Sequence, residues 1–295
     1  MSHALSTQQT QQFHDDGFFV LRGVLPDEAM RPLIDELENK IDDLTKEAVS
    51  EGLLDVSKTF DDAPFDRRLA LVCDACRERN WIWRRLQHGK YKSPGMFKLR
   101  TAPVLLDIVE SLIGPEIYGH PQYALRAKMP NHEETVVPWH QDLGYLVPED
   151  AGETLFVNCW LPFVDATDEN GCLQVIRGSH RFGFLPHEKL LDMADHTATK
   201  GIPEADIPEG EIVTCEVSKS DVLLTMERVV HRSIPNRSDT VRWSLDTRYS
   251  QLGLPTGRTY TPGFVARSAA NPDQVAKSYE DWVRIFEEAG IALDR

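Results

Sequence analysis

The spacing of apolar residues predicts that the first third of the chain is helical. Ser6 is expected to begin a polar helix that ends near Gly17, and residues 18–21 follow as a short apolar strand. Proline and acidic residues at 26–28 are favoured in the first turn of a helix, so a long helix is predicted to begin there. A further helix is expected at 103–112. One face of the long helix should be buried, because its apolar residues recur at steps of three and four: Met30, Leu33, Ile34, Leu37, Ile41 and Leu44.

After these helices the apolar residues alternate with polar ones, which is the period of β-strands. In 122–128, Gln122 and Lys128 belong to one face and Tyr123 belongs to the other. Short strands separated by turn residues indicate a sandwich or barrel, and a last helix is expected at 279–289. The expected strands are 122–128, 154–161, 172–176, 211–217, 221–224 and 241–251.

The chain is predicted to form a single domain over residues 1–295. No repeat, low-complexity tract or linker divides it, and its length is sufficient for one buried core. Within this domain, residues 1–115 are expected to be mostly helical, residues 116–252 to form the β core, and residues 253–295 to form a C-terminal loop and helix.

Composition and charge disfavour several classes of partner. Lysine and arginine total 32 against 47 acidic residues, a net charge of −15, and such a surface repels nucleic-acid phosphates. No apolar stretch approaches the roughly 20 residues of a membrane-spanning helix. Residues 1–12 do not resemble a signal peptide, and five cysteines are too few for a secreted disulfide scaffold. We therefore expect a cytoplasmic protein with neither a nucleic-acid nor a membrane partner.

A candidate metal site is formed by His140, Asp142 and His231. On an extended segment, side chains two residues apart leave the same face, so His140 and Asp142 can occupy adjacent positions on one ion. Two histidines and one carboxylate on one face of an octahedron form the facial triad of non-haem iron(II) oxygenases. A lone His-x-Asp also occurs by chance, and a histidine after two valines can simply be a core residue, so the triad needs a further signal.

Arg242 supplies that signal. It follows His231 by eleven residues (242 − 231 = 11), a spacing that fits a turn and a neighbouring strand and would place its guanidinium beside the metal. Arginine offers a planar fork for a carboxylate and stays charged when buried. It could anchor the distal carboxylate of 2-oxoglutarate, with Ser244 on its strand face or Ser233 supplementing the anchor.

Several short motifs occur along the chain beside the candidate ligands. They are Phe-His-Asp-Asp-Gly-Phe at 13–18, Trp-His-Gln-Asp at 139–142, Glu-Asn-Gly-Cys-Leu at 169–173, Gly-Ser-His at 178–180 and the run 231–242. Together they resemble the phytanoyl-CoA dioxygenase family of Fe(II)/2-oxoglutarate oxygenases and occur in the order expected for that family, although Arg177 stands where proline is common before Gly-Ser-His.

The resemblance implies a mainly β fold, in which N-terminal helices pack on one sheet of a cupin-like double-stranded β-helix, or jelly roll. It implies ferrous iron, Fe(2+), and 2-oxoglutarate as cofactors. Dioxygen would be the oxidant, and a C–H of a small molecule would be hydroxylated with release of succinate and CO₂. Asp142 argues against halogenation, because related halogenases lack this carboxylate. The implied metal ligands are His140, Asp142 and His231, and the implied co-substrate contacts are Arg242, Ser233, Gln122 and Trp160.

Three further residues are candidates for contacts with the substrate. Arg126 shares the inward strand face with Gln122 and could bind an anionic group of the substrate, or it could form an ion pair with one of the many acids. Leu143 and Tyr145 directly follow Asp142, where the rim of the site is expected. The sequence predicts no particular substrate and no oligomeric state.

Two other functions remain open at this point. The first is a cupin-like metalloenzyme that uses the same triad without 2-oxoglutarate, and the second is a catalytically silent ligand-binding barrel. Arg242 distinguishes the first from a 2-oxoglutarate oxygenase, because only the latter needs an anchored dicarboxylate. A silent barrel has no physical need for the triad and Arg242 together.

Overall fold

The computed structural model describes residues 3–87, 91–147, 155–190, 200–258 and 260–291. Its helices within these ranges are α1 (Thr7–Asp16), α2 (Asp27–Ser50), α3 (Phe65–Ala75), α4 (Trp81–Gln87), α5 (Pro94–Arg100), α6 (Pro103–Ile113) and α8 (Tyr279–Glu288). Its strands are β1 (Phe18–Leu21), β2 (Ile117–Lys128), β3 (Val137–His140), β4 (Phe156–Pro162), β5 (Leu173–Ile176), β6 (Glu188–Lys189), β7 (Lys200–Gly201), β8 (Ile212–Cys215), β9 (Val222–Met226), β10 (His231–Ser233), β11 (Arg242–Gln251) and β12 (Phe264–Arg267).

The helices predicted from the apolar spacing are present. Ser6 caps α1 and forms a capping box with Gln9, while Gly17 ends the helix in the left-handed conformation at φ 80° that glycine adopts without strain. The predicted stripe of α2 is buried along its length. The helix at 103–112 is α6, and the C-terminal helix is α8.

Two antiparallel sheets form the centre of the molecule. The larger has the strand order β1-β9-β4-β11-β2-β12, and the smaller has the order β3-β10-β5-β8. Trp160 and Leu223 of the larger sheet share a buried cluster with Val175 and Cys215 of the smaller one, so the two sheets pack face to face. The site described below lies between them.

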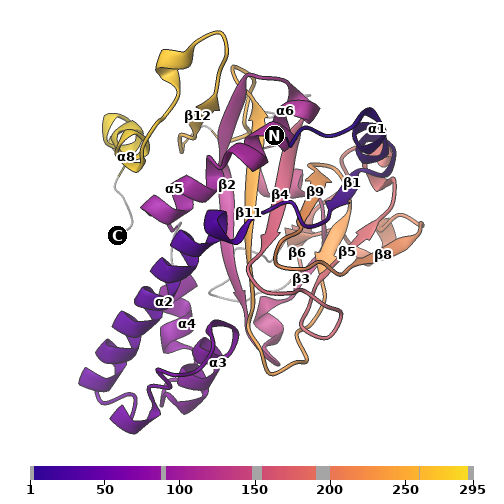
Figure 1. Ribbon diagram of the computed structural model, residues 1–295. Coiled ribbons are helices and arrows are strands. Elements are labelled where there is room, and N and C mark those ends of the chain that lie inside the picture. The colour runs from indigo at the N-terminus through magenta and orange to yellow at the C-terminus, as the bar shows by residue number, and fades with distance from the viewer. Residues whose placement is uncertain (1–2, 88–90, 148–154, 191–199, 259, 292–295) are drawn as a thin grey trace.

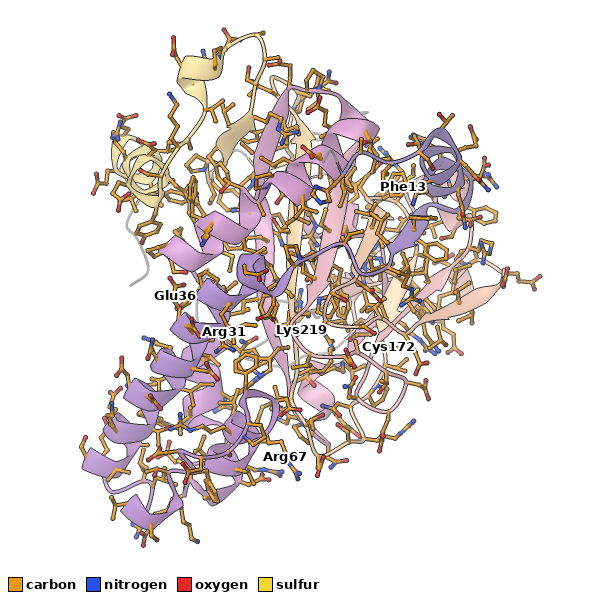
Figure 2. The ribbon with its side chains drawn as sticks, viewed as in Figure 1. Phe13, Arg31, Glu36, Arg67, Cys172 and Lys219 are labelled. Atoms are coloured by element: carbon orange, nitrogen blue, oxygen red, sulfur yellow. The ribbon has the colours of Figure 1, made fainter. Side chains whose placement is uncertain are left out.

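The other face of the larger sheet is covered by helices. Figure 1 shows α2 to α5 gathered on the β2 side of the molecule, whereas α1 lies at the opposite side beside β1. Glu36 of α2 lies where that helix meets α5 (Figure 2) and accepts a hydrogen bond from the backbone N–H of Gly95 at 2.7 Å. A side chain at position 95 would collide with the backbone of Leu33, so glycine permits this close helix contact.

Strand β11 connects the helical core to the interior between the sheets. It pairs with β2 on one side and β4 on the other, and its side chains alternate between the two faces. Trp243, Leu245 and Tyr249 are buried with the helices. The opposite, inward face is also buried but polar and charged: Arg242, Ser244, Asp246, Arg248 and Ser250.

Candidate active site

The three predicted metal ligands converge in the structure. His140 is the last residue of β3, His231 is the first of β10, and the two lie directly opposite one another in this antiparallel pair. The Nε2 atoms of His140 and His231 lie 3.8 and 4.0 Å from Oδ1 of Asp142. All three side chains are buried, and their potential ligand atoms lie within 4.8 Å of one another.

Backbone carbonyls orient both imidazoles. Nδ1 of His140 lies 2.8 Å from the carbonyl oxygen of Pro138, and Nδ1 of His231 lies 3.1 Å from that of Val229. Since a carbonyl only accepts, each Nδ1 carries a proton, and the nitrogen that can bind a metal is Nε2, which faces Asp142. Burial and the neighbouring His231 lower the pKa of His140 well below its ordinary value, which keeps this ring in the neutral form that binds metals.

Asp142 lies just beyond β3 rather than on it. The strand ends at His140, Gln141 remains extended at φ −109° and ψ 141°, and Asp142 begins a 3₁₀ turn over Asp142–Tyr145. The side chain of Gln141 fixes this turn, because its amide donates to the carbonyls of Gly183 and Arg228 and its oxygen accepts from the backbone N–H of Leu185. The extended residue 141 still directs residues 140 and 142 to one side, as the spacing predicted.

Arg248 holds the carboxylate of Asp142 and was not predicted. Its Nε donates to Oδ2 at 3.1 Å and its Nη2 to Oδ1 at 2.5 Å, a bidentate pair buried on both sides. Burial alone would raise the pKa of Asp142, but the charge and the hydrogen bonds of Arg248 hold it below its ordinary value. Asp142 is therefore ionised and fixed in orientation at neutral pH.

The donor set fits a transition metal. Adjacent octahedral positions about 2.1 Å from one ion lie about 3 Å apart, so the nitrogen and oxygen donors here need to approach by roughly 1 Å. Two neutral imidazoles and one carboxylate on one side of the ion leave three positions open on the other. These are the requirements of a ferrous site that also binds a keto acid and dioxygen.

Arg242 lies in the same interior but reaches it from a different direction than predicted. The segment after His231 does not turn onto a neighbouring strand, because β10 and β11 belong to the two facing sheets. Nη1 of Arg242 donates to Oγ of Ser244 at 2.5 Å, and the guanidinium lies 5.0 Å from the ring centre of Trp160. Its Nε is buried without a hydrogen-bond partner. Arg242 thus offers an unused donor between the sheets.

Ser233 and Lys128 lie beside Arg242. Lys128 is directly opposite Arg242 in the β2–β11 pair, and its Nζ donates to Oγ of Ser233 at 3.0 Å. The alternation from Gln122 to Lys128 had placed Lys128 on the inward face, but nothing in the sequence joined it to Arg242. The missing information is the register of two strands more than 110 residues apart in the chain.

The residues predicted to contact the substrate or co-substrate lie in different environments. Arg126 donates to Asp246 at 2.9 Å, so the ion pair considered from the sequence is present. Tyr145 packs edge-on against His140, with ring centres 5.2 Å apart. Leu143 is buried with Leu146 and Phe156. Gln122 is half-buried. Contacts of these residues with a substrate or co-substrate stay predictions.

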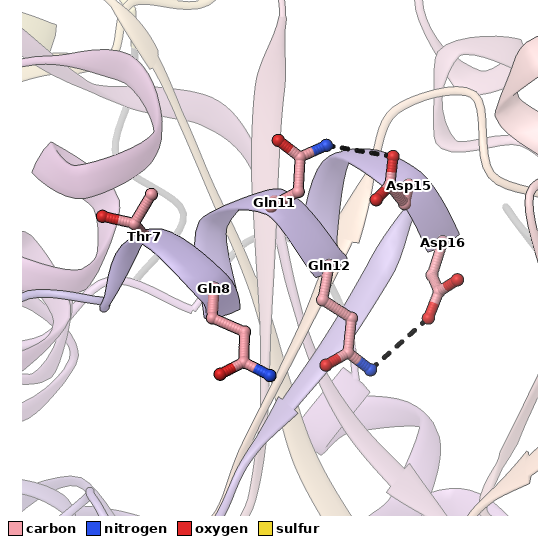
Figure 3. Close-up of a pocket in the computed structure, with 6 residues that line it drawn as sticks. All are labelled: Thr7, Gln8, Gln11, Gln12, Asp15 and Asp16. Atoms are coloured by element: carbon pink, nitrogen blue, oxygen red, sulfur yellow. Dashed lines mark hydrogen bonds between the residues drawn. The ribbon is translucent and has the colours of Figure 1, made fainter.

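A separate hollow on the molecular surface lies away from these residues. Figure 3 shows that it follows α1, where Gln11 and Gln12 donate to Asp15 and Asp16 one turn later. All of its lining side chains come from this one helix, and four of the six form hydrogen bonds with one another. It offers no converging chemistry comparable to the interior between the sheets.

Comparison with known proteins identifies the family of this chain. The model of the family Phytanoyl-CoA dioxygenase (PhyH) matches residues 13–244. The chain belongs to the phytanoyl-CoA dioxygenase family. A phytanoyl-CoA dioxygenase domain-containing protein 1 of Danio rerio is 29% identical over 264 residues, which cover 81% of this chain and 87% of that protein. The predicted family is confirmed.

Solved structures confirm the fold. A non-heme monooxygenase, ThoJ in its apo form, superposes with a TM-score of 0.56 at 20% identity, covering 96% of this chain and 94% of the other. EctD from S. alaskensis with bound Fe gives a TM-score of 0.54 at 20% identity, covering 84% and 77%. The predicted double-stranded β-helix with flanking helices is correct.

Family membership and the site together place the chain among the iron- and 2-oxoglutarate-dependent oxygenases, with iron and 2-oxoglutarate as cofactors. In the ranges that the structure describes, no helix combines the length and the apolar character needed to cross a membrane.

Proposed function

We propose that this chain is a hydroxylase that uses Fe(II), 2-oxoglutarate and dioxygen to oxidise an aliphatic C–H of a small molecule, with release of succinate and CO₂. The observation that supports this most is that Arg242 is buried on the same face of β11 as Arg248, which binds the carboxylate of Asp142. Burying a guanidinium that has an unused hydrogen-bond donor costs free energy unless an anion binds to it. The distal carboxylate of 2-oxoglutarate is such an anion.

Each group of the site has a distinct role in this proposal. Bound iron supplies the oxidative chemistry that couples decarboxylation of the keto acid to attack on a C–H bond. His140 and His231 present neutral Nε2 atoms, and Asp142 presents an ionised oxygen. Arg242, with Ser233 and Ser244 beside it, binds and orients the co-substrate, with Trp160 under the guanidinium. The enclosing sheets exclude water from the reacting groups.

Arg242→Met should weaken 2-oxoglutarate binding by about 100-fold, because a bidentate charge-assisted interaction contributes roughly 3 kcal/mol. The measurement is an anaerobic titration of the Fe(II) protein with 2-oxoglutarate, followed through the metal-to-ligand charge-transfer absorption. The exposed Arg79→Met serves as the control and should titrate like the unmodified protein. A metalloenzyme that does not use 2-oxoglutarate, or a silent barrel, would develop no such band even without substitution.

We further propose that the substrate is anionic. Three guanidinium groups, from Arg126, Arg242 and Arg248, face the interior, against two carboxylates from Asp246 and Asp142. A ferrous ion and a 2-oxoglutarate dianion cancel one another, so one positive charge remains for a third ligand. The side chain of Arg126 is 33% exposed and so stays accessible while paired.

Arg126→Gln should abolish the preference for an anionic substrate while leaving 2-oxoglutarate affinity within about threefold. The measurement is succinate release with carboxylic acids and their methyl esters offered as pairs, with the acid expected to be favoured at least tenfold by the unmodified protein. Equal release from acid and ester would contradict the anionic substrate.

A cytoplasmic location also stays a prediction, since one human relative is named as peroxisomal.

A further inference from the structure

Lys128 is buried in a way that its present contacts do not explain. Its exposed fraction is 2%, and its Nζ donates only to the carbonyl of Thr135 at 2.8 Å and to Oγ of Ser233 at 3.0 Å. Both acceptors are neutral. Among the described residues, no carboxylate lies within ion-pairing distance of Nζ. Burying a lysine costs free energy unless an anion or a loss of charge compensates it.

Among the described residues, the ionisable groups that affect Lys128 most are cationic or neutral. Arg242 faces it from β11, and Arg126 lies on its own strand but is already paired with Asp246. Cys172 lies before β5, where burial raises the pKa of its thiol to about 12 and so keeps it neutral at physiological pH. Burial and the charge of Arg242 together lower the pKa of Lys128 to about 6.

Hydrogen-bond donors converge at this point without an acceptor for them. Oγ of Ser233 already accepts from the backbone N–H of Val137 at 3.0 Å and from Lys128, so its own hydroxyl proton remains to be donated. Nε of Arg242 is a second unused donor. Lys128 connects the two groups, because its Nζ bonds to Ser233 and its position on β2 is directly opposite Arg242. A carboxylate bound beside Lys128 would provide the acceptor that the hydroxyl and the guanidinium lack.

The lysine is also held in place. Gly171 adopts φ 90°, and a side chain there would meet Cε of Lys128 at 2.5 Å and the carbonyl oxygen of Ile234 at 2.7 Å. Only a glycine lets this turn lie against the methylene chain of Lys128. The amino group is therefore directed toward Ser233 before any ligand arrives.

We propose that Lys128 is a second cationic group of the co-substrate site, which binds the distal carboxylate of 2-oxoglutarate together with Arg242 and Ser233 and takes up a proton as it does so. This inference rests on the proposed function and adds a residue and a proton to it. In the free site the amino group is neutral beside Arg242. When the carboxylate arrives, its negative charge stabilises the ammonium form, so one proton enters with each co-substrate.

Proton uptake sets the direction of the pH dependence. A lysine that is neutral in the free protein and charged in the complex makes binding weaker as pH rises between the two pKa values, by about tenfold per pH unit. Below about pH 6 the lysine is charged in both states and the dependence from this group disappears. Affinity for 2-oxoglutarate should therefore fall steadily from pH 6.5 to 8.

The test is calorimetric titration of the Ni(II)-loaded protein with 2-oxoglutarate at pH 7.5, in buffers of low and high ionisation enthalpy. The unmodified protein should take up close to one proton per ligand bound. Lys128→Met should take up none, lose the slope with pH, and bind 2-oxoglutarate about 10- to 100-fold more weakly. Lys46→Met, an exposed lysine on α2, is the matched control and should behave like the unmodified protein.

A second ligand separates a lost carboxylate contact from general damage to the fold. 2-Oxopentanoate has the same carbon chain but no distal carboxylate, so Lys128→Met should leave its affinity unchanged. An equal loss for both ligands, or proton uptake that persists in Lys128→Met, would overturn the assignment. If the unmodified protein binds no 2-oxoglutarate, the proposed function itself fails, which is a different result from binding without proton uptake.

Discussion

Asp142→Ala should reduce 2-oxoglutarate-dependent succinate formation by at least about 1,000-fold, and His140→Ala should do the same. Asp142 is the one anionic ligand among the three, and its loss leaves two neutral imidazoles that hold a ferrous ion weakly. The measurement is succinate release with added Fe(II), together with the dissociation constant of Co(II) from its visible absorption. Metal affinity should fall in parallel with turnover.

The alanine substitution at Asp142 also leaves Arg248 without its anionic partner, so lost activity alone could reflect a damaged fold. Asp142→Asn keeps the shape and one hydrogen-bond acceptor, and His140→Ala does not touch Arg248 at all. Asp74→Ala, which removes an exposed acid on α3, is the control for a lost carboxylate. Turnover that survives both Asp142→Asn and His140→Ala would remove the triad from the mechanism.

The parts of this fold that were predictable from the sequence are those determined by local periodicity. The stripe of α2 and the alternation of β2, β4 and β11 each repeat over several residues, because one face of each element packs into the hydrophobic core shared with the helices. Leu155, Val157, Cys159 and Leu161 alternate along the strand expected at 154–161, and all four pack in the core that the helices share. Thr154, where that strand was expected to begin, lies outside the described residues.

The two strands that carry the histidine ligands, β3 and β10, were not predicted. β3 has four residues and β10 has three, too few for a period of two to be visible, and β3 contains a proline. Their pairing places His140 opposite His231 across 91 positions of sequence (231 − 140 = 91). The spacing of His140 and Asp142 indicated a shared face, but only the fold brings the second histidine to it.

Arg248 and Lys128 show a second limit of prediction from the sequence, which concerns the partners of side chains. Arg248 is an even number of residues from Arg242, so a continuous strand must direct both to the same face. That signal was available in the sequence. It does not reveal that one guanidinium reaches a metal ligand and the other faces Lys128, because this depends on how β2 and the facing sheet are aligned with β11. Arg126 illustrates the same point, since its partner Asp246 lies two residues beyond the residue directly opposite it.

Arg248→Met should destabilise the metal-free protein by about 3 to 5 kcal/mol, the usual cost of removing one partner of a buried ion pair. Asp142 and Arg248 have side-chain exposures of 2% and 4%, so water does not replace the lost guanidinium. The measurement is the free energy of unfolding by urea, with and without saturating Ni(II). Arg248→Lys keeps the charge but loses the bidentate fork. Its free energy of unfolding should lie between those of the unmodified protein and Arg248→Met.

The metal should compensate for the missing arginine. A divalent ion at the triad provides the positive charge that Asp142 requires, so Ni(II) should recover most of the stability that Arg248→Met loses. The unmodified protein should gain less from the metal, because its carboxylate is already paired. An equal loss with and without Ni(II) would mean that Arg248 only fills space near Asp142.

The effect of Arg248→Met on the stability of the metal-free protein should depend on pH, and the pKa of Asp142 sets the direction of that dependence. In the unmodified protein Arg248 keeps the pKa of Asp142 below its ordinary value, so the stability from this group is present at neutral pH and is lost only as pH falls into the acidic range. Without Arg248, burial dominates and raises the pKa of Asp142 above its unfolded value. The folded variant then binds more protons than the unfolded chain, and its stability falls as pH rises. The difference in unfolding free energy between the two proteins should therefore grow from pH 5 to pH 8, and a constant difference would contradict the role of Arg248 as the counter-charge of a metal ligand.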